Sequence, residues 1–234
     1  PEFIGAGPER IWDNGFMILI LILLFAVSMG IFEAAVVVYL RELYYPLGFS
    51  FPLKDIDSLV LLTEIGREAA SLLMIAVTAW SAGRTFIRRI AYVLIIFGVW
   101  DLVYYGMLAL IFDWPKSLMD WDILFLIPVP WVAPVLAPVL SALGLTVMGL
   151  ILNRLDTRGY LVDLTPRDLL AAAVAAAPVL ASFFASTRTV VDGNFPERYP
   201  WALFFSGFIF SWIYFIARIR TDRKSTRLNS SHVS

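Results

Sequence analysis

Long apolar runs are the feature that most limits how this chain of 234 residues can fold. The first run, Gly15–Leu40, begins with ten large apolar residues, Phe16–Phe25. About 20 helical residues cross the hydrocarbon core of a bilayer, where an isolated helix satisfies its own backbone hydrogen bonds. The composition agrees, because 60% of the residues are hydrophobic and 16% are charged, whereas about 25% are charged in soluble domains. The sequence predicts an all-α, polytopic integral membrane protein with one transmembrane helical bundle.

Six segments are predicted to span the membrane, and in two of the loops between them, Arg41–Asp57 and Asp113–Asp122, aromatic residues stand beside proline. They are Gly15–Leu40, Ser58–Ala82, Ile90–Phe112, Trp131–Leu152, Pro166–Thr187 and Trp201–Ala217. In the first span, Ala26, Gly30 and Ala34 recur every four residues. Such a stripe of small residues predicts a close contact with a neighbouring helix.

Proline is expected to shape the fourth and fifth spans. Residues 123–130 are read as irregular or interfacial, because four prolines interrupt the apolar run that begins there, namely Pro128, Pro130, Pro134 and Pro138. Proline removes a backbone donor and clashes with the preceding turn of a helix, so a bend is predicted. The fifth span has a strong start signal, since Thr165 can cap the helix, Pro166 fits its first position and Asp168 its third.

The last residues, 222–234, are expected to be a non-native tail. The segment DRKSTRLNSSH closely resembles the conceptual translation of a common sequencing adapter, and the chain starts at Pro1, so a fragment truncated at one or both ends is predicted. The chain contains no Cys, and its single His, His232, lies in this tail. Sites built on His or Cys, including haem and zinc sites, are therefore not expected. No cofactor or metal is predicted beyond a bound proton or monovalent cation.

The second span carries three charges, Glu64, Arg67 and Glu68. Three central charges cost about 8 kcal/mol, and the nine Leu, Ile and Val residues of this span return about 4 kcal/mol. This helix must therefore face protein or water on one side, or carry protonated acids. The alternative is a helix lying in the membrane interface with its charges in water, against which the long apolar half Leu72–Val77 argues.

Other buried acids are predicted at the same depth as these charges. Counting about 1.5 Å per helical residue, Glu33, Glu64, Glu68 and Asp101 all lie roughly 9–17 Å below one membrane boundary. If every group were ionised, these four acids and Arg67 would carry a charge of −3. Such a charge is untenable in a low dielectric, so protons or a cation are the expected compensation.

Several polar groups are expected to support this acidic layer. Arg67 can pair with Glu64 at i+3 and balance the charge, and Ser71 lies on the same helical stripe. Tyr104 and Tyr105 are placed at i+3 and i+4 to donate hydrogen bonds to Asp101. The carbonyls of Pro130 and Pro134 lose their usual helical donors and are expected to face the layer.

Lys and Arg are distributed unevenly between the two sets of loops, nine against five. The larger set is Arg10, Arg84, Arg88, Arg89, Arg154, Arg158, Arg167, Arg218 and Arg220. The smaller set is Arg41, Lys54, Lys116, Arg188 and Arg198. The positive-inside rule then places both ends of the chain in the cytoplasm, in what we expect to be a prokaryotic inner membrane. The expected partners are lipid and a membrane protein or a second copy, not nucleic acid.

Three functions remain open on the sequence alone. The leading hypothesis is a proton- or cation-linked transporter, or a subunit of a transport or energy-converting complex, which need not be an enzyme. The alternative is a non-catalytic scaffold or assembly subunit whose buried charges are structural. A membrane-embedded enzyme acting on a lipid is less favoured, because it would need an acid/base pair open to a lateral groove and carboxylate-only metal binding.

Overall fold

The computed structural model describes residues 15–52, 54, 56–160 and 164–231. Its elements follow in the order α1 (Gly15–Tyr44), α2 (Ser58–Ala82), α3 (Phe86–Phe112), β1 (Trp121–Phe125), β2 (Trp131–Pro134), α4 (Leu136–Thr157), α5 (Pro166–Phe184), α6 (Thr187–Val191) and α7 (Trp201–Ser231). The predicted helical bundle is confirmed. Arg10 and His232 lie outside the described residues.

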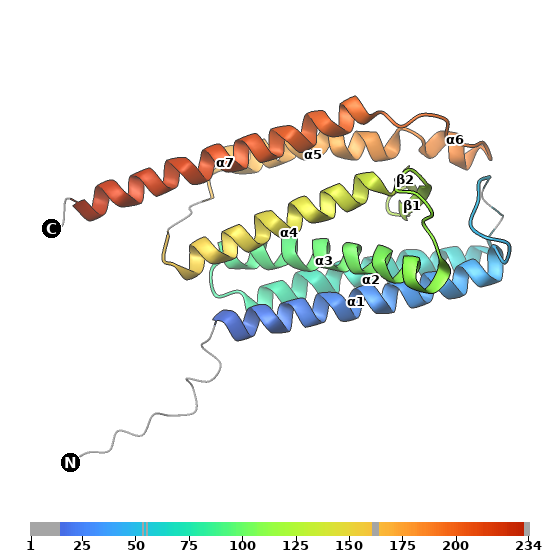
Figure 1. Cartoon of the computed structure of the whole chain (residues 1–234), viewed down its shortest axis with the longest axis horizontal. Helices are drawn as coiled ribbons and strands as arrows, with labels where there is room; N and C mark the ends of the chain where they lie inside the picture. Colours follow the sequence, from blue (N-terminus) through green and yellow to red (C-terminus); the bar gives the residue numbers. More distant parts are fainter. Residues whose placement is uncertain (1–14, 53, 55, 161–163, 232–234) are drawn as a thin grey trace, which may run out of the picture.

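Five helical segments of the described chain are long and apolar enough to cross a membrane. They are Gly15–Tyr44, Phe86–Phe112, Leu136–Thr157, Pro166–Val191 and Trp201–Thr221. The protein is therefore an integral membrane protein. The predicted second span forms a helix with the expected bounds, Ser58–Ala82, but its three charges keep it out of this apolar set. It nevertheless runs alongside α1 and α3, so six spans remains our prediction (Figure 1).

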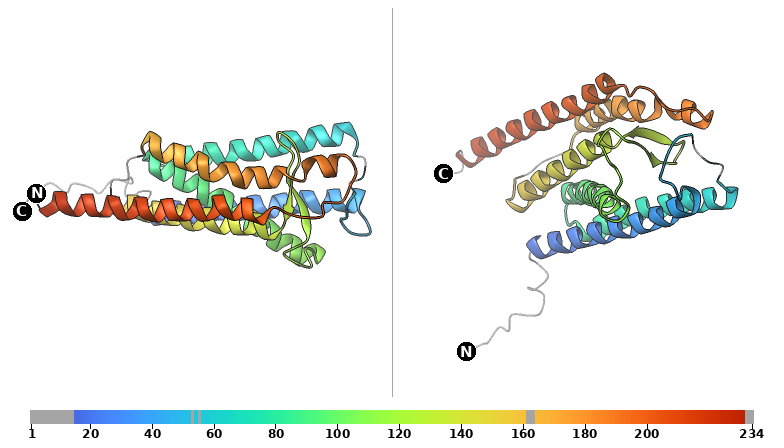
Figure 2. Two further views of the ribbon diagram at one scale, coloured as in Figure 1. Left: turned by 90° about the horizontal axis from the view of Figure 1, so that it is seen from above. Right: turned by 45° about the vertical axis from the view of Figure 1, so that its right-hand side comes forward.

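The long helices run roughly parallel or antiparallel to one another (Figure 1). α3 lies at the centre, where it packs against α1, α2 and α4. α5 and α7 form a second unit, and α4 separates this pair from α1, α2 and α3 (Figures 1 and 2). The β1–β2 hairpin lies at the end of the bundle where α1 ends and α2 begins (Figure 1).

Small residues bring the helix backbones together. A Cβ on Gly30 would lie 2.7 Å from the carbonyl oxygen of Trp100, which confirms the predicted close contact of the Ala26, Gly30 and Ala34 stripe. The same arrangement joins α3 to α4, because a Cβ on Gly98 would lie 2.4 Å from the Ala142 carbonyl oxygen. The interfaces α1–α3 and α3–α4 therefore depend on residues without bulk, as is common in membrane helices.

The predicted fourth span, Trp131–Leu152, is wrong at its start. Residues Trp131–Pro134 form β2, which pairs antiparallel with β1, and the helix begins only at Leu136. Proline explains the difference, because Pro134 cannot donate within a helix but fits the end of a short strand. Pro138 falls in the first turn of α4, where a backbone N–H has no helical acceptor.

The other predicted boundaries shift by a few residues. α1 continues to Tyr44, and α3 starts at Phe86 because Thr85 accepts a hydrogen bond from the Arg88 N–H as its N-cap. The predicted start of α5 is confirmed, since Thr165 and Asp168 form a capping box. α7 continues past the predicted end at Ala217 into the segment expected to be non-native.

Candidate functional site

A cavity of about 430 Å³ lies at the hairpin end of the bundle. All four acids singled out from the sequence line it, namely Glu33, Glu64, Glu68 and Asp101. Arg67 and Tyr104 also line it, whereas Ser71 and Tyr105 are not among its lining residues. The exposed residues Lys54 and Gly193 belong to its wall, so the cavity reaches the surface. The structure thus brings the predicted acids to one place, and their function remains a prediction.

Arg67 joins two of these acids. Its Nε donates to Glu64 Oε2 at 2.8 Å, which is the expected pair within α2. Its Nη1 donates to Glu33 Oε2 on α1, a partner that helical periodicity alone could not assign. The three side chains are 13–16% exposed, so one guanidinium holds two carboxylates in a partly desolvated place.

Glu68 is held by the hairpin rather than by another charge. Both of its carboxylate oxygens accept from the backbone N–H of Leu126, at 2.9 and 3.1 Å. Leu126 directly follows β1, and Glu68 itself is 6% exposed. This hydrogen bond ties α2 to the hairpin.

Asp101 differs from the other acids, because no described residue forms a hydrogen bond or ion pair with its carboxylate. Tyr104 and Tyr105 were expected to donate to it. Tyr105 donates instead to Asp122 Oδ2, at 3.2 Å. The expectation that Tyr104 and Tyr105 donate to Asp101 is therefore wrong for both. For Tyr105 the reason is that the hairpin places a second carboxylate within reach of its hydroxyl.

A buried ion pair that the sequence did not reveal completes the site. Arg41 Nη2 donates to Asp122 Oδ1 at 3.0 Å, and the two side chains are 5% and 3% exposed. The guanidinium carbon of Arg41 lies 3.7 Å from the ring centroid of Trp114 and 4.7 Å from that of Phe49. Burial raises the pKa of Asp122, and the positive charge of Arg41 opposes that rise.

Both residues of this pair were assigned to loops beyond the ends of the predicted spans. Arg41 instead belongs to the last turns of α1, and Asp122 to β1. Helical spacing offers no signal for this pair, because its two residues are 81 positions apart in the chain.

The charges around the cavity do not balance. Five carboxylates line it, from the four predicted acids and Asp122, against the guanidinium groups of Arg41 and Arg67 and the ammonium group of the exposed Lys54. The formal charge of the lining is therefore −2 if every group is ionised, whereas −3 was predicted from four acids and Arg67 alone. In a partly desolvated cavity such an excess is costly and calls for compensation.

Only one of the two prolines lies at the cavity. Pro130 lines it, although its carbonyl accepts a hydrogen bond from Thr187 Oγ1 at 2.6 Å. Pro134 pairs with Trp121 in the hairpin and is not among the lining residues. The described part of the chain contains no group of three or more His, Asp or Glu side chains arranged to bind a metal ion.

Comparison with known proteins finds no matching family model, no matching curated protein and no matching solved structure. The function is therefore inferred from the residues of the cavity.

Proposed function

We propose that the protein is a proton- or cation-linked membrane transporter, or a subunit of a transport or energy-converting complex. Glu33, Glu64, Glu68 and Asp101 exchange the proton or monovalent cation, and Arg67 balances their charge. The observation that carries the proposal is the excess of carboxylates around one cavity that reaches the surface. Ionisable groups inside a membrane commonly mark ion pathways and proton relays.

Asp101 is the first candidate for the exchanging group. Glu33 and Glu64 share Arg67, and Glu68 accepts from a backbone amide, so each has a fixed donor. No described residue donates to Asp101, so it can bind and release a proton or cation without breaking a contact within the protein. Glu68 is the second candidate, because its two oxygens share a single donor.

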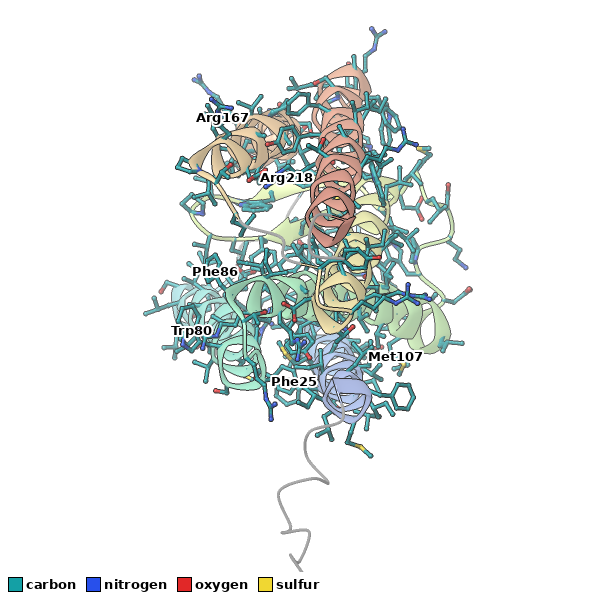
Figure 3. The ribbon with its side chains drawn as sticks, turned by 90° about the vertical axis from the view of Figure 1, so that its left-hand side faces the viewer. Phe25, Trp80, Phe86, Met107, Arg167 and Arg218 are labelled. Carbon is teal, nitrogen blue, oxygen red and sulfur yellow. The ribbon has the colours of Figure 1, made fainter. Side chains whose placement is uncertain are left out.

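We also propose that both ends of the chain are cytoplasmic, in a prokaryotic inner membrane. The positive-inside count gave one set of loops nine arginines, and the described members of that set lie toward the end of the bundle opposite the cavity. Figure 3 shows two of them at that end, Arg167 on α5 and Arg218 on α7. The smaller set at the cavity end includes Arg41, which is buried in an ion pair. The cavity then opens toward the outside.

Ion flux into proteoliposomes tests the transport function. Vesicles loaded with the pH-sensitive dye pyranine receive an inward Na⁺ or K⁺ gradient, and the internal pH is followed. Wild-type protein should move protons faster than empty vesicles do. Asp101→Asn should reduce the rate at least tenfold and Glu68→Gln should reduce it less, whereas the exposed control Asp113→Asn should match wild type.

Two results would count against the proposal. One is a wild-type rate equal to that of empty vesicles with both cations. The other is an unchanged rate in Asp101→Asn and Glu68→Gln, provided that both variants elute from size exclusion as wild type does.

A scaffold or assembly subunit is the second candidate, and the cross-element contacts of the acids favour it. The Arg67–Glu33 pair joins α1 to α2, and the Glu68–Leu126 hydrogen bond joins α2 to the hairpin. In that case Arg67→Leu should prevent folding or assembly, Arg67→Lys should restore it partly, and a membrane protein partner or a second copy should co-purify in mild detergent. Such results together with an unaltered flux in Asp101→Asn would favour the scaffold.

A further inference from the structure

Two carboxylates in the wall of the cavity form no ion pair with a described residue. Glu68 accepts only from the backbone N–H of Leu126, and no described residue donates to Asp101. Asp101 is half-buried rather than sealed, and it lines the cavity, so a molecule in the cavity can reach its carboxylate. Glu33 acts with like charge on both acids. An uncompensated negative charge of this kind in a partly desolvated place calls for a cation.

The acids of the cavity do not converge on one point, as the ligands of a metal ion do. Ions such as Ca²⁺ and Mg²⁺ are held by several oxygen atoms at about 2.0–2.6 Å. Among the described residues, no three His, Asp or Glu side chains are arranged in that way. The cavity has a volume of about 430 Å³, within the range of about 300–1,000 Å³ typical of small-molecule sites. The negative charge therefore surrounds a space that fits an organic molecule.

Aromatic rings form a large part of the wall. Six of them line the cavity, namely Tyr44, Tyr45, Phe49, Trp100, Tyr104 and Phe125. Two of these rings already bind cations of the protein. The guanidinium carbon of Arg41 lies 4.7 Å from the ring centroid of Phe49, and Lys54 Nζ lies 5.4 Å from that of Tyr45. The wall thus contains rings of the kind that attract cations, and it offers more rings than the protein itself uses.

Tyr104 places a ring beside the unpaired carboxylate of Asp101. It lies three residues further along α3, on the same side of the helix. Tyr104 is half-buried, lines the cavity and has no cation of a described residue over its ring. A carboxylate and an aromatic ring are the two groups that recognise a substituted ammonium group, since the carboxylate supplies the opposite charge and the ring attracts the cation and contacts its methyl groups.

We propose that the cavity binds an organic cation, a small molecule with a substituted ammonium group and no anionic group. The ammonium group lies against Asp101, and its apolar substituents lie against Tyr104 and the aromatic wall. An anionic group on the ligand would be repelled by the excess of carboxylates around the cavity. The inference rests on the proposed function, because the organic cation would be the cargo that takes the place of the proton or inorganic cation.

Calorimetry on the full chain in uncharged maltoside micelles tests the inference. The probe is choline. It is compared with its neutral carbon isostere 3,3-dimethylbutan-1-ol, with glycine betaine, which also carries a carboxylate, and with K⁺, which has no apolar surface. Choline should bind at least tenfold more tightly than each of the three.

Variants assign the binding to the two proposed walls. Asp101→Asn should weaken choline at least tenfold, whereas the exposed control Asp113→Asn should not change its affinity. Tyr104→Leu removes the ring and should weaken choline at least threefold, and Tyr104→Phe, which keeps the ring, should restore the affinity. Tyr39→Leu is the matched control, because Tyr39 is exposed on α1 and is not among the lining residues.

The headgroup of a choline lipid also carries a substituted ammonium group, beside a phosphate. A short-chain phosphatidylcholine, added below its micellar concentration, should therefore displace choline no better than the matching phosphatidylglycerol does. Selective displacement by phosphatidylcholine would assign the site to a lipid headgroup and overturn the assignment to a free organic cation.

Two further results would overturn the inference. One is choline binding no tighter than that of even one of the three comparison probes. The other is wild-type affinity for choline in both Asp101→Asn and Tyr104→Leu. If Asp101→Asn does not fold, the probes and the Tyr104 variants still decide it. Choline binding without ion flux would refute only the transporter, and ion flux without choline binding would refute only this inference.

Discussion

Arg41 Nη2, near the end of α1, donates a hydrogen bond to Asp122 Oδ1 on β1 at a distance of 3.0 Å, and both side chains are almost completely buried. The two residues are 81 positions apart in the chain, so this pair fixes the hairpin to the first helix. Together with the hydrogen bond from Leu126 to Glu68, it holds the hairpin over the cavity from two sides.

Removing one partner of this ion pair should strongly destabilise the protein. Asp122→Asn leaves the Arg41 charge buried without a counter-ion, for which the expected loss in free energy of unfolding is about 3–5 kcal/mol. The measurement is denaturant unfolding in detergent micelles, followed by tryptophan fluorescence. The double variant Arg41→Leu/Asp122→Leu should recover more than half of the loss, because a well-packed apolar pair replaces the ions. Lys116→Ala, which breaks an exposed pair with Asp113, should change little. Equal losses in Asp122→Asn and the double variant would contradict the explanation.

A methyl group at Gly30 should separate α1 from α3. Its Cβ would lie 2.7 Å from both the Trp100 carbonyl oxygen and the Val103 Cβ, so the helices must move apart. Gly30→Ala is expected to lower the free energy of unfolding by about 1–3 kcal/mol. Gly66→Ala is the matched control, because nothing lies within 4 Å of its Cβ position, and it should be neutral or stabilise by about 0.5–1 kcal/mol. The same unfolding assay compares them, and a larger loss at Gly66 would show that the α1–α3 packing is not as described.

Asp168 should contribute to stability in two separable ways. It completes the capping box of α5 with Thr165, and it accepts from Tyr214 and Arg218 on α7. Tyr214→Phe removes one hydrogen bond and should cost about 1 kcal/mol of unfolding free energy. Asp168→Ala removes the cap and both contacts to α7, so its loss should exceed that of Tyr214→Phe. Equal effects of the two variants would mean that the cap and the Arg218 contact together contribute nothing measurable.

Sequence patterns of short range predicted much of this structure. The bounds of α2, the capping box at Thr165 and the Glu64–Arg67 pair follow from helical spacing over a few residues. The shared depth of Glu33 and Asp101 with the acids of α2 followed from counting residues along each span. All of these inferences use contacts within one helix or the alternating direction of successive helices.

The contacts made by the hairpin could not be predicted in the same way. Four prolines in an apolar run indicated irregular backbone, but not that Asp122 would meet Arg41 or that Leu126 would reach Glu68. Those contacts depend on how a short β-hairpin folds back over the ends of three helices. The redirection of Tyr105 from Asp101 to Asp122 has the same cause.

The number and direction of the spans can be tested by cysteine labelling, since the chain has no Cys of its own. Ser50 lies before α2, Thr157 ends α4, and Asn194 lies between α6 and α7, all on the exposed surface. In intact cells of a bacterial expression host, a membrane-impermeant maleimide should label Ser50→Cys and Asn194→Cys but not Thr157→Cys. Permeabilised cells should label all three. The reverse pattern would invert the proposed orientation.

If α2 does not cross the membrane, Ser50→Cys must instead share its side with Thr157→Cys, because only α3 and α4 then separate those two positions. Labelling of Ser50→Cys and Asn194→Cys from opposite sides would therefore remove α2 from the spans, and its charges would lie in water rather than in a membrane cavity.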